Sequence, residues 1–292
     1  MPQTFSAHLS DALARTAACV GLDPVLERLP EAVRAEHWEP TRAIEQFCRG
    51  VLAALAEGGS PAVSIVKPQS ACFERYGSPG WGVLERIVRQ ARDMGLLVIL
   101  DAKRGDIGIS GEHYAAAAAA LGAHAITVNA YLGPETVEPY LAAGLGVFVL
   151  VRTSNPGSDV VQGRALSDGR TVAGMMAQHV ELLGRSRGHR GVLSSVGAVV
   201  GATKAAEGRA LRELMPDTPF LVPGYGAQGG TADDVRTLVR PGATGPATAG
   251  VVVNSSRAVL YPPTPDPARW REAIAGAAAA LVADLATVVT GG

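Results

Sequence analysis

The chain has 292 residues, of which 47% are hydrophobic, and a net charge of −1 at pH 7. This length and apolar content allow a large core, whereas the balanced charge without a basic stripe argues against a nucleic-acid partner. The three cysteines form no C-x-x-C pair, which fits neither a disulfide framework nor a zinc site and indicates a reducing, cytoplasmic location. We also expect no signal peptide and no membrane-spanning segment.

Eight short apolar segments are typical of strands that are buried on both faces, as in a parallel sheet. We expect these strands at residues 18–23, 62–67, 96–100, 123–130, 146–151, 195–201, 220–222 and 250–253. A segment with helical spacing or a helix-starting residue follows each strand. We expect these helices at residues 39–57, 80–94, 114–121, 134–143, 171–186, 204–215, 231–239 and 267–285. Ser110 is a candidate N-cap for the third helix.

The alternation of strands and helices predicts that the strands run parallel. Eight such units in a chain of this length predict a closed (β/α)8 TIM barrel. Since no linker or shift in composition interrupts the pattern, we expect a single domain over residues 1–292. An open, doubly wound sheet is the competing fold.

The C-terminal ends of the strands meet at one mouth of such a barrel, where active sites lie. Polar side chains occur at or just after the ends of most of the expected strands. They are Asp23, Lys67, Asp101, Lys103, Ser154, Gln228 and Arg257. A single residue of this kind would be read as a capping or solvated group, but their shared placement predicts a site.

The stretch after the third expected strand carries the strongest chemical signal. Asp101 and Lys103 are two residues apart, so on an extended backbone both side chains point to the same side. Asp106 follows a turn at Gly105. A lysine between two carboxylates is pushed towards its charged form, which suits a proton donor or fixed cation and disfavours a Schiff-base lysine. The alternative without chemistry is a solvated ion pair.

Glycines at positions 224, 226 and 229 match the spacing of a dinucleotide fingerprint. We reject this interpretation, because no Asp or Glu for a ribose occurs between Asp234 and Asp266 and because the motif follows the seventh strand. Glycines before a helix suit an anion, and barrels often bind phosphate after strands seven and eight, where Arg257 offers a planar fork. The sequence therefore predicts a phosphate site. No cluster of metal-ligating residues is apparent, and we expect neither a metal nor an organic cofactor.

Six segments resemble, in order and over nearly the whole chain, the orotidine 5′-phosphate decarboxylase family. They are residues 21–24, 66–68, 101–107, 153–157, 223–230 and 254–257. The D-x-K-x-x-D-I pattern of residues 101–107 is the most specific of these segments. The chain length and the Asn-Ser-Ser-Arg sequence of residues 254–257 resemble the longer bacterial branch of the family. The resemblance implies a cofactor-free lyase that converts orotidine 5′-phosphate to uridine 5′-phosphate, the last step of de novo pyrimidine biosynthesis. It also implies a nucleoside monophosphate as the partner and a cytoplasmic homodimer.

The resemblance assigns the chemistry to the third strand and its neighbours. Lys103 would protonate C6 of the pyrimidine as CO2 leaves. Asp101 would lie beside the substrate carboxylate and, with Lys67, would hold the charge network in place. Asp106 would reach into the site of the neighbouring subunit, which makes the active sites composite.

Other positions are implied to bind the substrate. Ile107 would line the neighbouring site, Ser110 would lie near the ribose, and Pro223 belongs to a matching segment. Asp23 would bind ribose hydroxyls, Ser154 the pyrimidine, and Gln228 and Arg257 the phosphate. A shorter Gly-Arg motif is common in the family where this chain has residues 254–257. The polar segment 158–170 is a candidate lid, and three of its residues are alternative substrate contacts: Gln162, Arg164 and Arg170.

Two other functions remain open. A sugar-phosphate decarboxylase or aldolase of the same barrel group shares the D-x-K-x-x-D pattern but acts through a metal-stabilised enediolate and needs acidic metal ligands. A non-catalytic nucleotide-binding barrel would be expected to lack Lys103 or Asp101, and the chain retains both.

Overall fold

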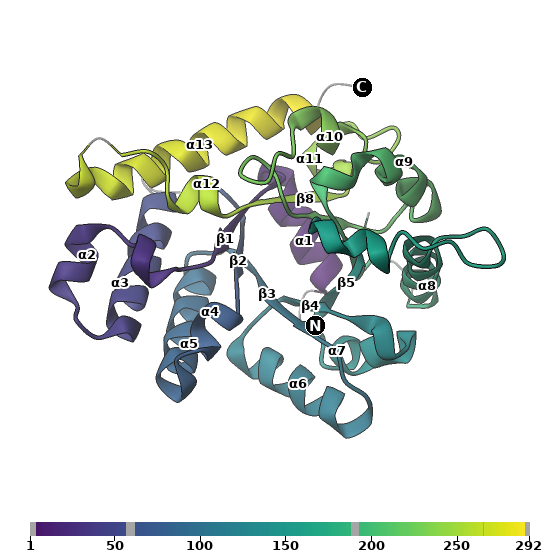
Figure 1. The fold of residues 1–292 in the computed structure, drawn as a ribbon, viewed down its shortest axis with the longest axis horizontal. Coiled ribbons are helices and arrows are strands. Elements are labelled where there is room, and N and C mark those ends of the chain that lie inside the picture. The colour runs from purple at the N-terminus through teal and green to yellow at the C-terminus, as the bar shows by residue number, and fades with distance from the viewer. Residues whose placement is uncertain (1–3, 57–61, 188–192, 265, 290–292) are drawn as a thin grey trace.

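A computed structural model describes residues 4–56, 62–187, 193–264 and 266–289. Eight parallel strands close into a barrel in sequence order, with β8 paired to β1 (Figure 1). They are β1 (Ala18–Leu22), β2 (Ile65–Pro68), β3 (Leu97–Arg104), β4 (Ala125–Val128), β5 (Gly146–Arg152), β6 (Val196–Val200), β7 (Phe220–Val222) and β8 (Val251–Ser255). The predicted TIM barrel is confirmed, and the open sheet is excluded because the barrel has no edge strand. That residues 1–292 form one domain stays a prediction.

Helices surround the barrel (Figure 1). Most follow the predicted pattern and are amphipathic, with an apolar face against the strands. They are α1 (Phe5–Arg15), α2 (Glu31–Glu36), α3 (Pro40–Leu55), α4 (Ala71–Glu74), α5 (Gly77–Asp93), α6 (Gly108–Leu121), α7 (Glu138–Ala142), α8 (Val172–Ser186), α9 (Ala205–Leu214), α10 (Ala232–Arg236), α11 (Pro246–Ala249), α12 (Arg257–Leu260) and α13 (Trp270–Val289). None of these helices in the described part of the chain is long and apolar enough to cross a bilayer.

The short helices α2, α4, α11 and α12 are absent from the sequence-based expectations, and two further local features differ from them. The sequence pattern does not predict α1, which lies against the start of β5, where Phe5 meets the ring of Phe148 edge-on at 6.1 Å. Ser110 does not cap α6, because Gly108 adopts a positive φ of 52° and turns the chain into the helix two residues earlier. The N-cap is Ile107, and Ser110 lies inside the first turn.

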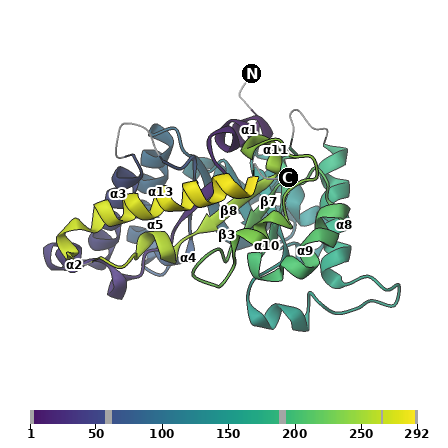
Figure 2. The same ribbon diagram turned by 90° about the horizontal axis from the view of Figure 1, so that it is seen from above.

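The two ends of the barrel carry different structures. Seen from above, α1 lies at one end, and the loop between β5 and α8 projects at the other end (Figure 2). This loop contains a short 3-10 helix, Pro156–Val160, and then the rest of the candidate lid. The end with the long loop is the C-terminal end of the strands, where the polar side chains converge.

Candidate active site

A cavity of about 780 Å³ occupies the C-terminal mouth of the barrel. Its walls come from the ends of the strands and the loops that follow them. Of the residues predicted for the site, those that line the cavity are Asp23, Lys67, Asp101, Lys103, Ser154, Pro223, Gln228 and Arg257. The convergence expected from strand ends is therefore present in the structure, although the roles of these residues stay predictions.

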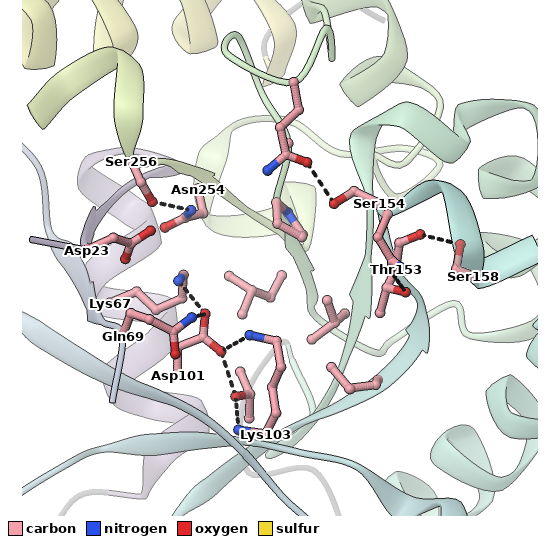
Figure 3. A pocket seen from close by; sticks show the side chains of 18 of the residues that line it. Asp23, Lys67, Gln69, Asp101, Lys103, Thr153, Ser154, Ser158, Asn254 and Ser256 are labelled. Atoms are coloured by element: carbon pink, nitrogen blue, oxygen red, sulfur yellow. Dashed lines mark hydrogen bonds and ion pairs between the residues drawn. The ribbon is translucent and has the colours of Figure 1, made fainter. Parts of the chain in front are cut away.

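Asp101 is the centre of the polar cluster at the floor of the cavity (Figure 3). One carboxylate oxygen, Oδ2, accepts a hydrogen bond of 2.5 Å from Lys67 Nζ, and the other, Oδ1, accepts one of 2.5 Å from Lys103 Nζ. Lys67 is buried, whereas the side chain of Lys103 is 44% exposed to the cavity. Lys67 therefore fixes the carboxylate from behind, and Lys103 presents its ammonium to a ligand.

Opposite charges control the ionisation of Lys67 and Asp101. Burial disfavours the ammonium of Lys67, but the charges of Asp101 and Asp23 and the bond to Asp101 outweigh this and raise the pKa of Lys67. Burial also favours the neutral form of Asp101, but the charges and hydrogen bonds of Lys67 and Lys103 hold the pKa of Asp101 far below its ordinary value. Both groups are thus charged at neutral pH, and the carboxylate cannot act as a general acid there.

Two polar residues absent from the sequence-based site complete the shell around Asp101. Gln69 Nε2 donates a hydrogen bond of 3.3 Å to Oδ2, and Thr127 Oγ1 donates one of 2.9 Å to Oδ1. Gln69 follows Lys67 by two residues, so the two-residue period of a strand could have found it. Thr127 is a buried hydroxyl in the middle of an apolar strand, which is a weaker signal for a site residue.

Asp106 is separate from this cluster within its own chain. Its Oδ1 accepts a hydrogen bond of 2.9 Å from the N–H of Ile107, and it does not line the cavity. Among the residues that the structure describes, Lys103 is therefore not flanked by two carboxylates of one chain, as its sequence spacing suggests, but pairs with Asp101. Ile107 and Ser110 also lie outside the cavity, and Ile107 is 59% exposed.

The loops after β7 and β8 meet at the opposite side of the cavity from the third strand. Gly224, Gly226 and Gly229 all have positive φ, which a glycine adopts without strain. Arg257 Nη2 donates a hydrogen bond of 3.2 Å to the carbonyl of Ala227, and this contact draws the two loops together. A guanidinium beside a glycine-rich turn suits an oxyanion such as phosphate.

Another part of the wall lies between β1 and β8. The Oδ1 atom of Asp23 is buried and has no hydrogen-bond partner in the described part of the protein. Asn254 Nδ2 donates a hydrogen bond of 3.2 Å to Ser256 Oγ, and both residues line the cavity near Asp23 (Figure 3). Because an unpaired buried carboxylate oxygen is costly, this corner is suited to a ligand that donates hydroxyl groups.

The candidate lid is fastened at its start. Arg152, at the end of β5, donates hydrogen bonds to Ser158 and Asp159 in the loop and to Glu207 of α9. Of the three alternative lid contacts, Gln162 alone lines the cavity, and its amide bonds Thr153. The other two residues do not line the cavity: Arg170 pairs with Asp168, and Arg164 is exposed.

Among the described residues, no three His, Cys, Asp or Glu side chains lie close enough together to hold a metal ion.

Together, the fold and the site define a (β/α)8 barrel of the enzyme type, in which a carboxylate-bridged lysine pair faces a glycine-rich turn and Arg257 across the mouth. The chain belongs to the orotidine 5′-phosphate decarboxylase / HUMPS family, whose sequence model matches residues 17–269. This confirms the resemblance that the six segments carry.

Individual relatives agree along almost the entire chain. Orotidine 5′-phosphate decarboxylase of Rhodopirellula baltica is 39% identical, over 94% of this chain and 96% of the relative. The enzyme of the same name from Salinispora tropica is 40% identical over 99% of each chain. The solved structure of Leishmania donovani OMP decarboxylase superposes with a TM-score of 0.79 at 29% identity, covering 98% of each chain.

Proposed function

We propose that this protein is a carboxy-lyase that converts orotidine 5′-phosphate to uridine 5′-phosphate in pyrimidine biosynthesis. The observation that carries the proposal is the half-exposed ammonium of Lys103, which Asp101 holds at 2.5 Å inside a cavity of about 780 Å³. Membership of the family and the names of relatives at about 40% identity support the same reaction.

The chemistry follows from the charge arrangement. Loss of CO2 from C6 of the pyrimidine leaves an electron pair in the ring plane, which the π system cannot delocalise. The ammonium of Lys103 stabilises this developing charge and then donates a proton to C6. Asp101 and Lys67 hold that ammonium in place, and the proposed step uses no metal or organic cofactor.

The remaining parts of the substrate match the rest of the cavity. Arg257 and Gln228 would bind the phosphate, and the unpaired oxygen of Asp23 would accept hydrogen bonds from ribose hydroxyls. Ser154 and Pro223 would face the pyrimidine, and the 158–170 segment would close over the ligand. Since the phosphate is remote from C6, its binding energy can drive closure without taking part in the bond-breaking step.

The proposal includes a homodimer with composite sites. Its support is that Asp106, Ile107 and Ser110 lie outside their own cavity, and that exposed apolar side chains occur around the start of α6 and in the loop after β4. These side chains are Ile107, Ile109, Tyr131 and Leu132. Exposed apolar side chains that gather in one region are typical of an interface between subunits. The proposal also places the enzyme in the cytoplasm, in keeping with three free cysteines.

Mixing two inactive variants tests the shared site. A Lys103→Ala chain combined with an Asp106→Asn chain should regain activity, because each heterodimer contains one site with both native residues. Proof of subunit exchange, by native mass spectrometry, is the necessary companion measurement. Exchange without recovered activity would show that Asp106 acts within its own chain or not at all.

The reaction itself is tested by the ultraviolet absorbance of orotidine 5′-phosphate mixed with the purified protein, with and without EDTA. We expect conversion to uridine 5′-phosphate at the same rate with and without EDTA, and no conversion by the Lys103→Ala variant. Tight binding of uridine 5′-phosphate without conversion would favour the non-catalytic barrel. No nucleotide binding, together with magnesium-dependent turnover of a sugar phosphate, would favour the other enzymes of the barrel group.

A further inference from the structure

The third and fourth strands are out of register at the active site. Leu100 pairs with Ile126 and Arg104 with Val128, so the three residues 101–103 lie opposite the single residue Thr127. This is a β-bulge, which locally interrupts the pairing of two strands and changes the direction of their side chains. On the β4 side, the proposed proton donor therefore lies in a segment that the sheet's own hydrogen-bond ladder does not hold.

The backbone of Lys103 shows the consequence of the bulge. Its φ is 47°, and it is the one non-glycine residue with positive φ in the described part of the chain. The left-handed region is disfavoured for a residue with a Cβ, and such conformations persist where the surroundings enforce them. Lys103 carries its ammonium to Asp101 from this conformation.

The hydroxyl of Thr127 occupies the gap in the ladder between β3 and β4. It joins Lys103 and Asp101, both of which are labelled in Figure 3. Thr127 Oγ1 accepts a hydrogen bond of 2.9 Å from the N–H of Lys103. The same oxygen donates a hydrogen bond of 2.9 Å to Asp101 Oδ1. Because a hydroxyl has one proton and accepts from an amide here, its proton is committed to the carboxylate. One buried hydroxyl thus ties the backbone of Lys103 to the carboxylate that binds its ammonium.

We infer that Thr127 is a positioning residue for proton transfer, which holds Lys103 in its left-handed conformation and Asp101 in its rotamer so that the ammonium faces C6. The inference rests on the proposed function, in which Lys103 is the donor. Without the hydroxyl, the partly buried N–H of Lys103 loses its hydrogen-bond partner, and the segment 101–103 relaxes towards an extended backbone. The ammonium then moves away from the position that the reaction requires.

The decisive comparison uses three variants in steady-state turnover of orotidine 5′-phosphate. Thr127→Val keeps the shape and removes the hydroxyl, and its kcat should fall about 10²-fold with little change in KM, as expected for a misplacement near 1 Å. Thr127→Ser keeps the hydroxyl and should retain most of the wild-type kcat. Equal losses in both variants would indicate packing rather than the hydroxyl and would overturn the inference, as would a wild-type kcat in Thr127→Val.

Thr218→Val is the matched control. Thr218 is also fully buried and donates a hydrogen bond of 3.0 Å to a carboxylate, Glu181 Oε2, but it lies just before β7, at the opposite end of the barrel. This variant should lower the melting temperature and leave kcat unchanged. A loss of kcat equal to that of Thr127→Val would show that any buried threonine hydroxyl matters equally, and the inference would fail.

Two further measurements keep the test decisive. In a crystal structure of Thr127→Val, φ of Lys103 should leave the left-handed region, and an unchanged φ and Nζ position would overturn the inference. This readout needs no turnover, so it stands even if the wild-type protein does not convert orotidine 5′-phosphate, a result that would contradict the proposed function itself. If Thr127→Val does not fold, Thr127→Cys, whose thiol is a weak donor and acceptor, should have a lower kcat than Thr127→Ser, and equal values would overturn the inference.

Discussion

The hydroxyl of Ser154 donates a hydrogen bond of 2.9 Å to the side-chain oxygen of Gln228, which joins the loop after β5 to the loop after β7. Because the amide oxygen of Gln228 accepts this bond, its Nε2 group is the part that can donate to a ligand. Ser154 therefore orients Gln228 for an anion. The same pair lies between the proposed pyrimidine and phosphate positions, so one substrate would contact both residues.

Substitution of Gln228 should weaken binding of the phosphate. A hydrogen bond to a charged group contributes about 1.5–3 kcal/mol, so Gln228→Ala should reduce kcat/KM by about 10- to 100-fold. Gln228→Glu should reduce it further, because a carboxylate repels the phosphate. The measurement is kcat/KM, together with the affinities for uridine 5′-phosphate and uridine. Equal weakening of both ligands by Gln228→Ala would argue against a contact with the phosphate.

Removal of Lys67 should expose the cost of a buried, partly unpaired carboxylate. Breaking a buried ion pair by removing one partner costs about 3–5 kcal/mol, and we expect this loss in the free energy of unfolding of Lys67→Met, along with loss of activity. Adding Asp101→Asn should restore part of the stability but none of the activity. Urea unfolding of the two single variants and the double variant gives the coupling energy. Strictly additive losses would contradict a direct interaction between Lys67 and Asp101.

The same ion pair predicts how stability depends on pH. Asp101 has a lowered pKa in the folded protein, so its contribution is present above the unfolded value of about 3.9 and is lost as the pH falls through the folded pKa. Lys67 has a raised pKa, so its contribution is present below about 10.4 and is lost as the pH rises through the folded pKa. The stability difference between wild type and Lys67→Met should thus be constant from about pH 5 to 9 and shrink below about pH 4. Urea unfolding across this range is the measurement, and a difference that already declines between pH 7 and 5 would contradict it.

Most of the barrel could be predicted from local sequence, because each strand is an apolar run buried on both faces and each following helix has its own periodicity. The capping box of α10, in which Thr231 and Asp234 bond each other's backbone N–H groups, is local in the same sense. Helix α1 escaped prediction because it precedes the first strand and has no place in the repeating unit. Its burial depends on packing against β5, which is distant in sequence.

The site divides in the same way. The convergence of Lys67, Asp101 and Lys103 could be predicted, since parallel strands bring their C-terminal ends together. The bulge could not, because a register shift is a relation between β3 and β4 and leaves no mark on either strand alone. The expected contact between Asp101 and Lys103 is present, but the extended backbone from which we expected it is wrong. The role of Thr127 depends on the bulge, so the sequence did not indicate it either.

A buried arginine at the other end of the barrel should matter for stability and not for chemistry. Arg212 of α9 is 2% exposed, and its guanidinium lies 3.6 Å from the ring centroid of Phe220. It donates hydrogen bonds to four backbone carbonyls, which join the end of α9 to the segments around β7 and β8: Met215, Thr218, Leu238 and Gly250. Several chain segments thus depend on one side chain.

Arg212→Met should lower the free energy of unfolding by at least about 3 kcal/mol, because each buried carbonyl left unpaired costs about 1–3 kcal/mol. Arg212→Lys should recover only part of this loss, since an ammonium lacks the planar fork that reaches several acceptors at once. Arg209→Met, at an exposed position of the same helix, is the matched control and should change stability little. Urea unfolding measures the stability, and kcat per folded molecule should stay at the wild-type value, because Arg212 lies at the end of the barrel opposite the cavity. A fall in kcat without a fall in stability would show instead that this end of the barrel is coupled to the site.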